Sequence, residues 1–229
     1  MFDIDFTGLD ADATLATAGS VRAVADRAEV LVLEAAAHWA DLHVHLDDPD
    51  GLPLPGMEEL VRFGGDGTPE VTEFAPAELG AELAMSAYAA RQLVADALDL
   101  RHRLPLLWGR VQAGEVKPWI GRKTAEATRD VSVEVAAVVD RRVSRWAHSL
   151  SWGRLEAIIE AVVVEADPAA AAAAAEQGER SQGVWLGQSN DHGVTDILIR
   201  TEAAAAIWFD ASVDRVADGL GALGDADPK

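Results

Sequence analysis

Residues 86–129, SAYAARQLVADALDLRHRLPLLWGRVQAGEVKPWIGRKTAEATR, decide the fold class. Pro105 and Pro118 stand where helices would begin, and Gly114 stands where one would end. Proline is favoured in the first turn of a helix and glycine just beyond its last residue. Alanine and leucine, both good helix formers, fill much of the rest. The stretch therefore predicts three successive helices, the first of them capped by Ser86.

The same pattern continues on both sides of this stretch. Pro76 suits the first turn of an earlier helix, and Ser132 and Ser151 are N-cap candidates for two later ones. Seven tryptophans are many for this length, and we expect those beside apolar stripes, Trp146 included, to fill the core. Residues 76–180 thus predict a central helical bundle.

The N-terminal segment, residues 1–46, predicts one long helix from about Asp12 to Val44. Apolar residues recur along it at three- and four-residue steps, the spacing of one helical face: Val21, Val24, Ala28, Leu31, Ala35 and Leu42. A narrow stripe held over three heptads suits either a helix hairpin within the chain or a coiled coil of two chains. Both alternatives stay open at this point.

Residues 47–75 and 181–229 differ from the helical centre. DDPDGLPLPG and GGDGTP predict a loop or linker, and GGDGTP lacks the lysine of a phosphate-binding loop, so we interpret it as a flexible connection. Two short β-rich runs around a turn predict a hairpin, and the residues from Thr201 onward predict a last helix. The overall prediction is a mainly α fold in which the hairpin and last helix pack with the bundle as one unit.

Composition excludes several classes of protein. The 229 residues contain no cysteine, which excludes disulfide scaffolds, thiolate-bound zinc and a cysteine nucleophile. No run approaches the roughly 20 apolar residues of a membrane helix, and the start lacks a basic signal segment. We expect a cytoplasmic protein with no membrane partner.

Charge is distributed unevenly along this acidic chain. The net charge is −20, yet residues 91–154 hold 12 of the 19 basic side chains. An anionic partner would meet the protein there, and internal pairing with acidic segments is the alternative. If the basic groups converge, they form a surface that contacts the phosphates of double-stranded DNA without reading its sequence. The predicted DNA-binding residues are Arg91, Gln92, Arg101, Arg103, Arg110, Lys117, Arg122, Lys123, Arg129, Arg141, Arg145 and His148.

Two of these predictions have a more specific basis. The helices on either side of Met85 have the spacing of a helix-turn-helix, in which Arg91 and Gln92 would read bases, although two core helices with a tight turn are the alternative. Asp96 and Asp99 are expected on the solvent side of the second helix. Arg141 and Arg145 are expected to share one helical face with His148.

For catalysis and for cofactors the sequence offers little. The H-x-H pair His43 and His45 lies at a predicted helix end, where alternate residues point apart, so we assign no metal site. No G-x-S-x-G sequence occurs, and no catalytic residue and no cofactor are predicted.

Several strings together resemble one known family. These are residues 78–132, with RHRLP and the W-x-x-V-x-A-G-E-V element, then VDRRV at 139–143, GVTDI at 193–197 and WFDASVDRVADGL at 208–220. The chain resembles the actinobacterial domain of unknown function 222, also called the thirteen-E-twelve repeat family, over roughly residues 20–225. The resemblance implies an N-terminal domain that stands before an HNH endonuclease module in longer relatives. That module's residues have no counterpart here.

The sequence therefore leads to two hypotheses. The first is a non-catalytic, DNA-associated accessory or regulatory domain of an HNH-endonuclease-type protein, which contacts phosphates through the central basic residues. The second is a protein-interaction module that forms a homodimer through its N-terminal helix, while its acidic flanks bind a basic partner or mimic DNA.

Overall fold

The computed structural model describes residues 5–46, 57–169 and 180–222, with the single positions 172, 176 and 178. The protein is mainly α, as the sequence predicts. Its chain divides into two compact units, Met1–Asp167 and Pro168–Lys229, and each is described here by itself. The expectation that the last segment joins the bundle stays a prediction.

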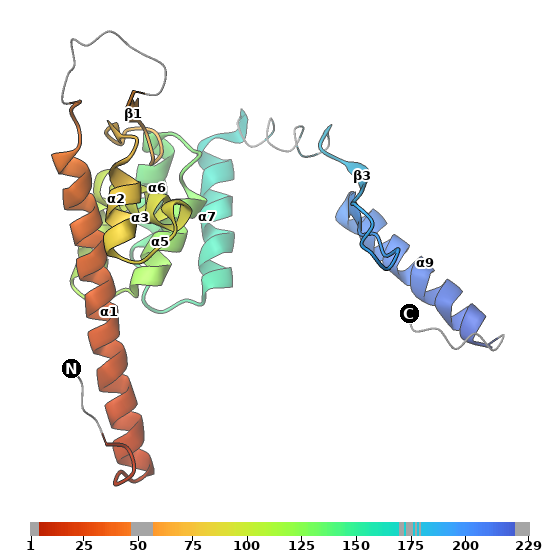
Figure 1. Cartoon of the computed structure of the whole chain (residues 1–229), viewed down its shortest axis with the longest axis horizontal. Helices are drawn as coiled ribbons and strands as arrows, with labels where there is room; N and C mark the ends of the chain where they lie inside the picture. Colours follow the sequence, from red (N-terminus) through yellow and green to blue (C-terminus); the bar gives the residue numbers. More distant parts are fainter. Residues whose placement is uncertain are drawn as a thin grey trace. The chain divides into compact units, whose positions relative to one another are not determined.

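Helix α1 (Ala11–Leu42) confirms the predicted long N-terminal helix. The Asp10 carboxylate caps it by accepting a hydrogen bond from the Ala13 N–H at 2.8 Å. Its buried residues all lie in the second half of the helix and define a bundle face: Val30, Leu33, Ala36, Ala37 and Ala40. The first half of α1 runs past the other helices of this unit (Figure 1).

Helices α2 (Ala75–Glu82) and α3 (Ala87–His102) pack tightly across a short turn. A Cβ on Gly80 would lie 2.8 Å from the Ala90 Cβ, so the close approach of the two helices requires glycine there. Ser86 caps α3 as predicted, accepting from the Ala89 N–H at 3.2 Å.

The surroundings of α3 favour the alternative of two core helices with a tight turn over groove reading. Every residue from 93 to 100 is buried, so α3 is a core helix rather than an exposed recognition helix. Asp96 and Asp99, expected on the solvent side, are 5% and 0% exposed. The reason is that α3 is packed against several helices at once: α1, α2, α4 and α5.

Four further helices complete the bundle, namely α4 (Pro105–Gln112), α5 (Pro118–Ala127), α6 (Val133–Val143) and α7 (Trp152–Ala166). Proline lies in the first turn of α4 and of α5, and Ser132 caps α6, as the sequence predicts. One core runs through all of them, with α6 packed on α7 and α5 bridging to α3.

The GGDGTP segment is packed rather than free. It follows β1 (Leu60–Val61) and precedes β2 (Val71–Thr72), which pair antiparallel. The Gly65 N–H donates to Asp99 Oδ1 at 2.7 Å, and Thr68 is 3% exposed. The interpretation of this segment as a flexible linker is therefore wrong, because a buried carboxylate holds its backbone.

The second unit confirms the predicted hairpin and last helix. Strands β3 (Gly183–Leu186) and β4 (Ile197–Arg200) pair antiparallel, with Trp185 opposite Leu198. Helix α9 (Ala203–Ala222) follows them. Within the part of the chain that the structure describes, no helix combines the length and the apolar character needed to cross a bilayer.

Candidate functional site

A buried ionic network holds several of the predicted DNA-binding residues. The Arg129 guanidinium lies 2.8 Å from Asp99 Oδ2 and 2.6 Å from Asp96 Oδ1. Arg122 Nε donates to the other oxygen of Asp96 at 2.7 Å. Arg103, 1% exposed, donates to Asp99 Oδ1 at 3.2 Å and to the Val131 carbonyl. All three arginines therefore pair with buried carboxylates, and Arg103 is itself buried.

Burial and pairing act on these groups in opposite directions. Burial raises the pKa of Asp96 above its ordinary value, and the hydrogen bonds from Arg122 and Arg129 offset only part of that effect. For Arg129, burial acts to lower the pKa, but the hydrogen bonds to Asp99 and Asp96 outweigh it and leave the pKa raised. The network thus keeps Arg129 charged.

Three further cations of the predicted surface also pair with carboxylates. Arg101 lies 2.6 Å from Asp41 of α1, and Arg110 lies 2.8 Å from Glu115. Lys117 pairs with Asp26 of α1. Internal pairing, the alternative left open above, therefore holds for six of the predicted residues: Arg101, Arg103, Arg110, Lys117, Arg122 and Arg129.

Three other residues on the predicted surface have different partners. Lys123 lies over the Trp152 ring, and Arg91 lies over the Phe63 ring with its guanidinium carbon 5.0 Å from the ring centre. Gln92 accepts a hydrogen bond from Arg129 at 2.8 Å, so it belongs to the buried network.

The end of α6 carries the exposed part of the basic segment. Arg141, Arg145 and Trp146 line one shallow pocket, which we name the arginine–tryptophan patch; Val138 and Arg142 complete its walls. Arg142 pairs with Glu165 at 2.7 Å, whereas Arg141 and Arg145 form no ion pair with any described residue. Trp146 is 53% exposed, so the expectation that it fills the core is wrong.

His148 does not join Arg141 and Arg145 in this patch. Its Nδ1 lies 3.3 Å from an Arg110 nitrogen, and Arg110 also donates to the Ser144 carbonyl. The helix ends at Val143, so the i, i+4, i+7 relationship expected from a continuous helix does not extend to His148. The exposed Trp146, and not His148, lies beside Arg141 and Arg145.

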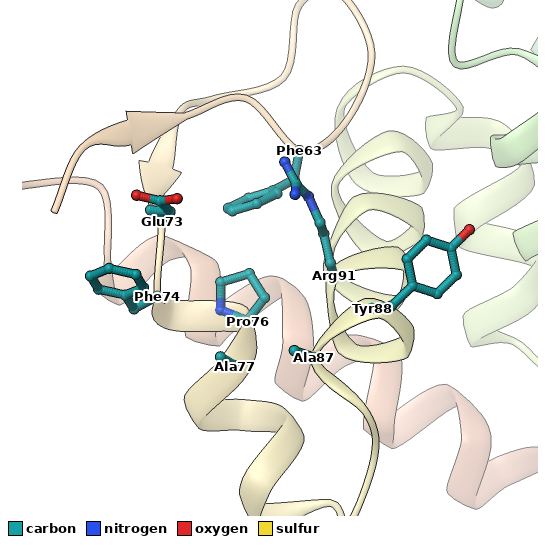
Figure 2. A pocket seen from close by; sticks show the side chains of 8 residues that line it. All are labelled: Phe63, Glu73, Phe74, Pro76, Ala77, Ala87, Tyr88 and Arg91. Atoms are coloured by element: carbon teal, nitrogen blue, oxygen red, sulfur yellow. The ribbon is translucent and has the colours of Figure 1, made fainter. Parts of the chain in front are cut away.

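A deeper pocket lies between the β1–β2 segment and the first turns of α2 and α3. Its cavity has a volume of about 360 Å³, and we name it the Arg91 pocket. Figure 2 shows Arg91 beside the Phe63 ring, with Phe74 and Pro76 on the neighbouring wall and Tyr88 directed away from Phe63. The lining residues are Phe63, Glu73, Phe74, Pro76, Ala77, Ala87, Tyr88 and Arg91. Sequence reasoning found Arg91 but not this pocket, because its walls come from segments distant along the chain.

The apolar stripe of α1 predicted from the sequence is exposed. Val21, Val24, Leu31 and Leu42 are 40%, 46%, 50% and 63% exposed. Together with Ala28 and Ala35, which are also exposed, they form what we name the heptad seam. At about 100° per residue, the seam lies on the side of α1 opposite the bundle face. The bundle therefore leaves the seam uncovered.

His43 is engaged with α1 rather than arranged with His45 as a metal ligand. Its Nδ1 lies 2.7 Å from the Trp39 carbonyl oxygen, and its ring packs on the Trp39 ring at an angle of 40°, with centroids 4.1 Å apart. Among the described residues no group of three His, Asp or Glu side chains is placed to hold a metal ion.

The family described as Domain of unknown function (DUF222) matches residues 52–228, more than three quarters of the sequence. The chain belongs to this family. The DUF222 match begins after α1, so the heptad seam lies outside the matched residues. No curated protein and no solved structure matches the chain.

Proposed function

We propose that this DUF222 protein is a protein-interaction module that forms a homodimer through the heptad seam of α1. The observation that carries the proposal is that an apolar stripe of coiled-coil spacing is exposed on the side of the helix facing away from the bundle. A second copy of the same helix, with the same repeat, is the occupant we propose.

The spacing favours another helix over other partners. Steps of three and four residues from Val21 to Ala35 keep the seam along one side of α1. A second helix with the same repeat stays in contact with this seam when the two helices supercoil around each other. Alanine at positions 28 and 35 permits close approach of two backbones. A partner helix would also cover the first half of α1, where residues 11–29 include no buried side chain in the structure.

The expected dimer is weak and depends on concentration. Two copies would cover eight partly exposed valine and leucine side chains, each worth about 1.5–3 kcal/mol when fully buried. Because about half of each is already buried, roughly 8 kcal/mol is available. At the lower end of the 4–15 kcal/mol that association costs, about 4 kcal/mol remains, which corresponds to a Kd of about 1 mM.

Substitutions on α1 test this proposal. In sedimentation velocity over a range of concentrations, the wild type shifts from monomer to dimer, and Leu31→Glu with Ala35→Glu stays monomeric. The matched control is Leu15→Glu, because Leu15 is 73% exposed but lies on the opposite side of the helix from the seam. A wild type that remains monomeric at millimolar concentration, or a control that dissociates equally, overturns the proposal.

Nucleic-acid contact is a second candidate, and one observation favours it. In the arginine–tryptophan patch, two arginines that form no ion pair with a described residue lie beside an exposed aromatic ring. This combination suits phosphate contact and base stacking. We propose it in place of a broad basic surface, because six of the predicted residues already pair with carboxylates, and the association with an HNH module stays part of this proposal.

Charge reversal tests the second candidate. Arg141→Glu with Arg145→Glu should abolish binding of a labelled oligonucleotide in fluorescence anisotropy, and the oligomeric state should not change. Arg154→Glu is the matched control, because it changes an exposed arginine on α7 outside the patch. Equal loss of binding in the control would show a response to net charge alone and would overturn the assignment to the patch.

A further inference from the structure

We propose that the Arg91 pocket binds a carboxylate attached to an apolar body, such as a small aromatic or branched carboxylic acid or the last residue of a peptide. This goes beyond dimerisation and nucleic-acid contact, because it assigns a ligand to a separate cavity of the first unit. The argument rests on the cavity, on one cation held in a fixed place and on the apolar walls around it.

The guanidinium of Arg91 lies over an aromatic ring and is not paired with a carboxylate of the described residues. Its guanidinium lies over the ring of Phe63, a residue only 8% exposed, with 5.0 Å between the guanidinium carbon and the ring centre. A guanidinium has five N–H donors, two of which can bind one carboxylate in a bidentate arrangement. Arg91 forms no ion pair with a described residue, although most arginines of this unit do.

The backbone beside Arg91 favours an anion as well. Ala87 and Tyr88 are the first two residues of α3, a helix of 16 residues, and both line the pocket. The N–H groups of these two residues have no acceptor within α3, because no helical turn precedes them, and the Ser86 hydroxyl caps the N–H of Ala89 instead. The positive end of the helix dipole adds to the charge of Arg91.

The other lining residues are mostly apolar and favour an apolar body on the ligand. Phe63, Phe74 and Pro76 present apolar surface to a volume of about 360 Å³, which is enough for a small molecule or one peptide residue. Glu73 is the one carboxylate among the lining residues and repels a second anion. The pocket therefore suits a ligand with a single negative charge at the Arg91 end and an uncharged body.

Titration with simple probes tests the assignment. Benzoate, the neutral isostere benzamide and acetate are added to the full chain, and the ¹H–¹⁵N signals of Ala87 and Tyr88 are followed. Benzoate should bind with a Kd of about 1 mM, the range expected for a ligand of this size, and at least 10-fold more tightly than benzamide or acetate. N-acetylphenylalanine, a mimic of the last residue of a peptide, and its C-terminal amide then distinguish the two sources. If the acid binds more tightly than benzoate and the amide does not bind, the pocket takes a peptide end; if benzoate binds and N-acetylphenylalanine does not, it takes a small free acid.

Four substitutions at three lining residues assign the role of each. Arg91→Gln should weaken benzoate binding about 10-fold or more. Arg91→Lys should weaken it less, because lysine keeps the positive charge but lacks the two parallel N–H donors of the guanidinium. Glu73→Gln should strengthen benzoate binding severalfold. Phe74→Ala, at a side chain that is 49% exposed, should weaken benzoate without affecting acetate.

The same titrations can overturn the proposal. Equal affinity for benzoate and benzamide would exclude a role for the charge of Arg91. Signal changes that avoid Ala87 and Tyr88 would place binding elsewhere. As a control for folding, each variant should unfold with the same profile as the wild type. We expect this because Arg91, Glu73 and Phe74 are all exposed. Because the pocket shares no residue with the heptad seam, loss of dimerisation leaves this result unaffected.

Discussion

The Nε of Arg129 lies 2.8 Å from Oδ2 of Asp99, a carboxylate whose side chain is completely buried. Arg129 comes from the turn after α5 and Asp99 from the last turn of α3, so the pair joins two segments of the bundle. A buried carboxylate is tolerated only when it is paired and hydrogen-bonded. Asp99 meets this condition through Arg129, Arg103 and the Gly65 N–H.

We predict that Arg129→Met destabilises the protein by about 3–5 kcal/mol, because it leaves Asp96 and Asp99 buried with too few partners. The control is Arg122→Met: the Arg122 side chain is 39% exposed and Asp96 keeps Arg129, so the expected cost is about 1 kcal/mol. Urea unfolding monitored by circular dichroism measures both. Equal losses in the two variants would contradict the role assigned to Arg129.

Gly65→Ala should destabilise strongly. The added Cβ would lie 2.2 Å from Arg103 Nη1 and 2.3 Å from the Arg129 carbonyl oxygen, so the backbone or the buried network must shift. Gly109→Ala is the matched control, because nothing lies within 4 Å of its Cβ and it sits inside α4. Alanine should stabilise that helix by about 0.5–1 kcal/mol. Melting temperatures should therefore change in opposite directions in the two variants.

The pH dependence of stability should reveal Asp140. Burial raises the pKa of Asp140 above 3.8, even though its carboxylate accepts hydrogen bonds from the Leu106 and Leu107 N–H groups at 2.8 and 2.9 Å. A raised pKa means that the folded state binds a proton more tightly than the unfolded state does. The stabilising contribution of protonated Asp140 to the free energy of unfolding is then present below about pH 3.8 and is lost as the pH rises through the folded-state pKa.

This effect is measured against Asp140→Asn, which does not titrate. The free energy of unfolding of the wild type minus that of the variant should fall as the pH rises from about 3.8 and then become constant. Urea unfolding in a series of buffers gives the difference. A difference that grows with pH would mean that the two N–H groups outweigh burial and lower the pKa instead.

Added salt should change the affinities of the two proposed interactions in opposite directions. Two copies that each carry a charge of −20 repel one another, so added salt should strengthen the dimer by screening. Binding of duplex DNA by two arginines should weaken about 10-fold when salt rises fourfold. Sedimentation and anisotropy at the same salt concentrations compare the two. A dimer that weakens with salt would contradict an apolar seam.

Local signals located most of the secondary structure correctly. The prolines opening α4 and α5 and the serines capping α3 and α6 act within one helical turn, so neighbouring residues are enough to predict them. The hairpin of β3 and β4 is likewise a contact between nearby segments. These features follow from backbone hydrogen bonds that a few consecutive residues satisfy.

The environment of each charge, by contrast, depended on residues far apart along the chain. Asp99 is 34 residues from its Gly65 donor, and Asp41 is 60 residues from Arg101. No local pattern encodes such separations, so the sequence could show an excess of cations but not which carboxylates neutralise them. For the same reason it could show the apolar stripe on α1 but not that the bundle would pack against the opposite face.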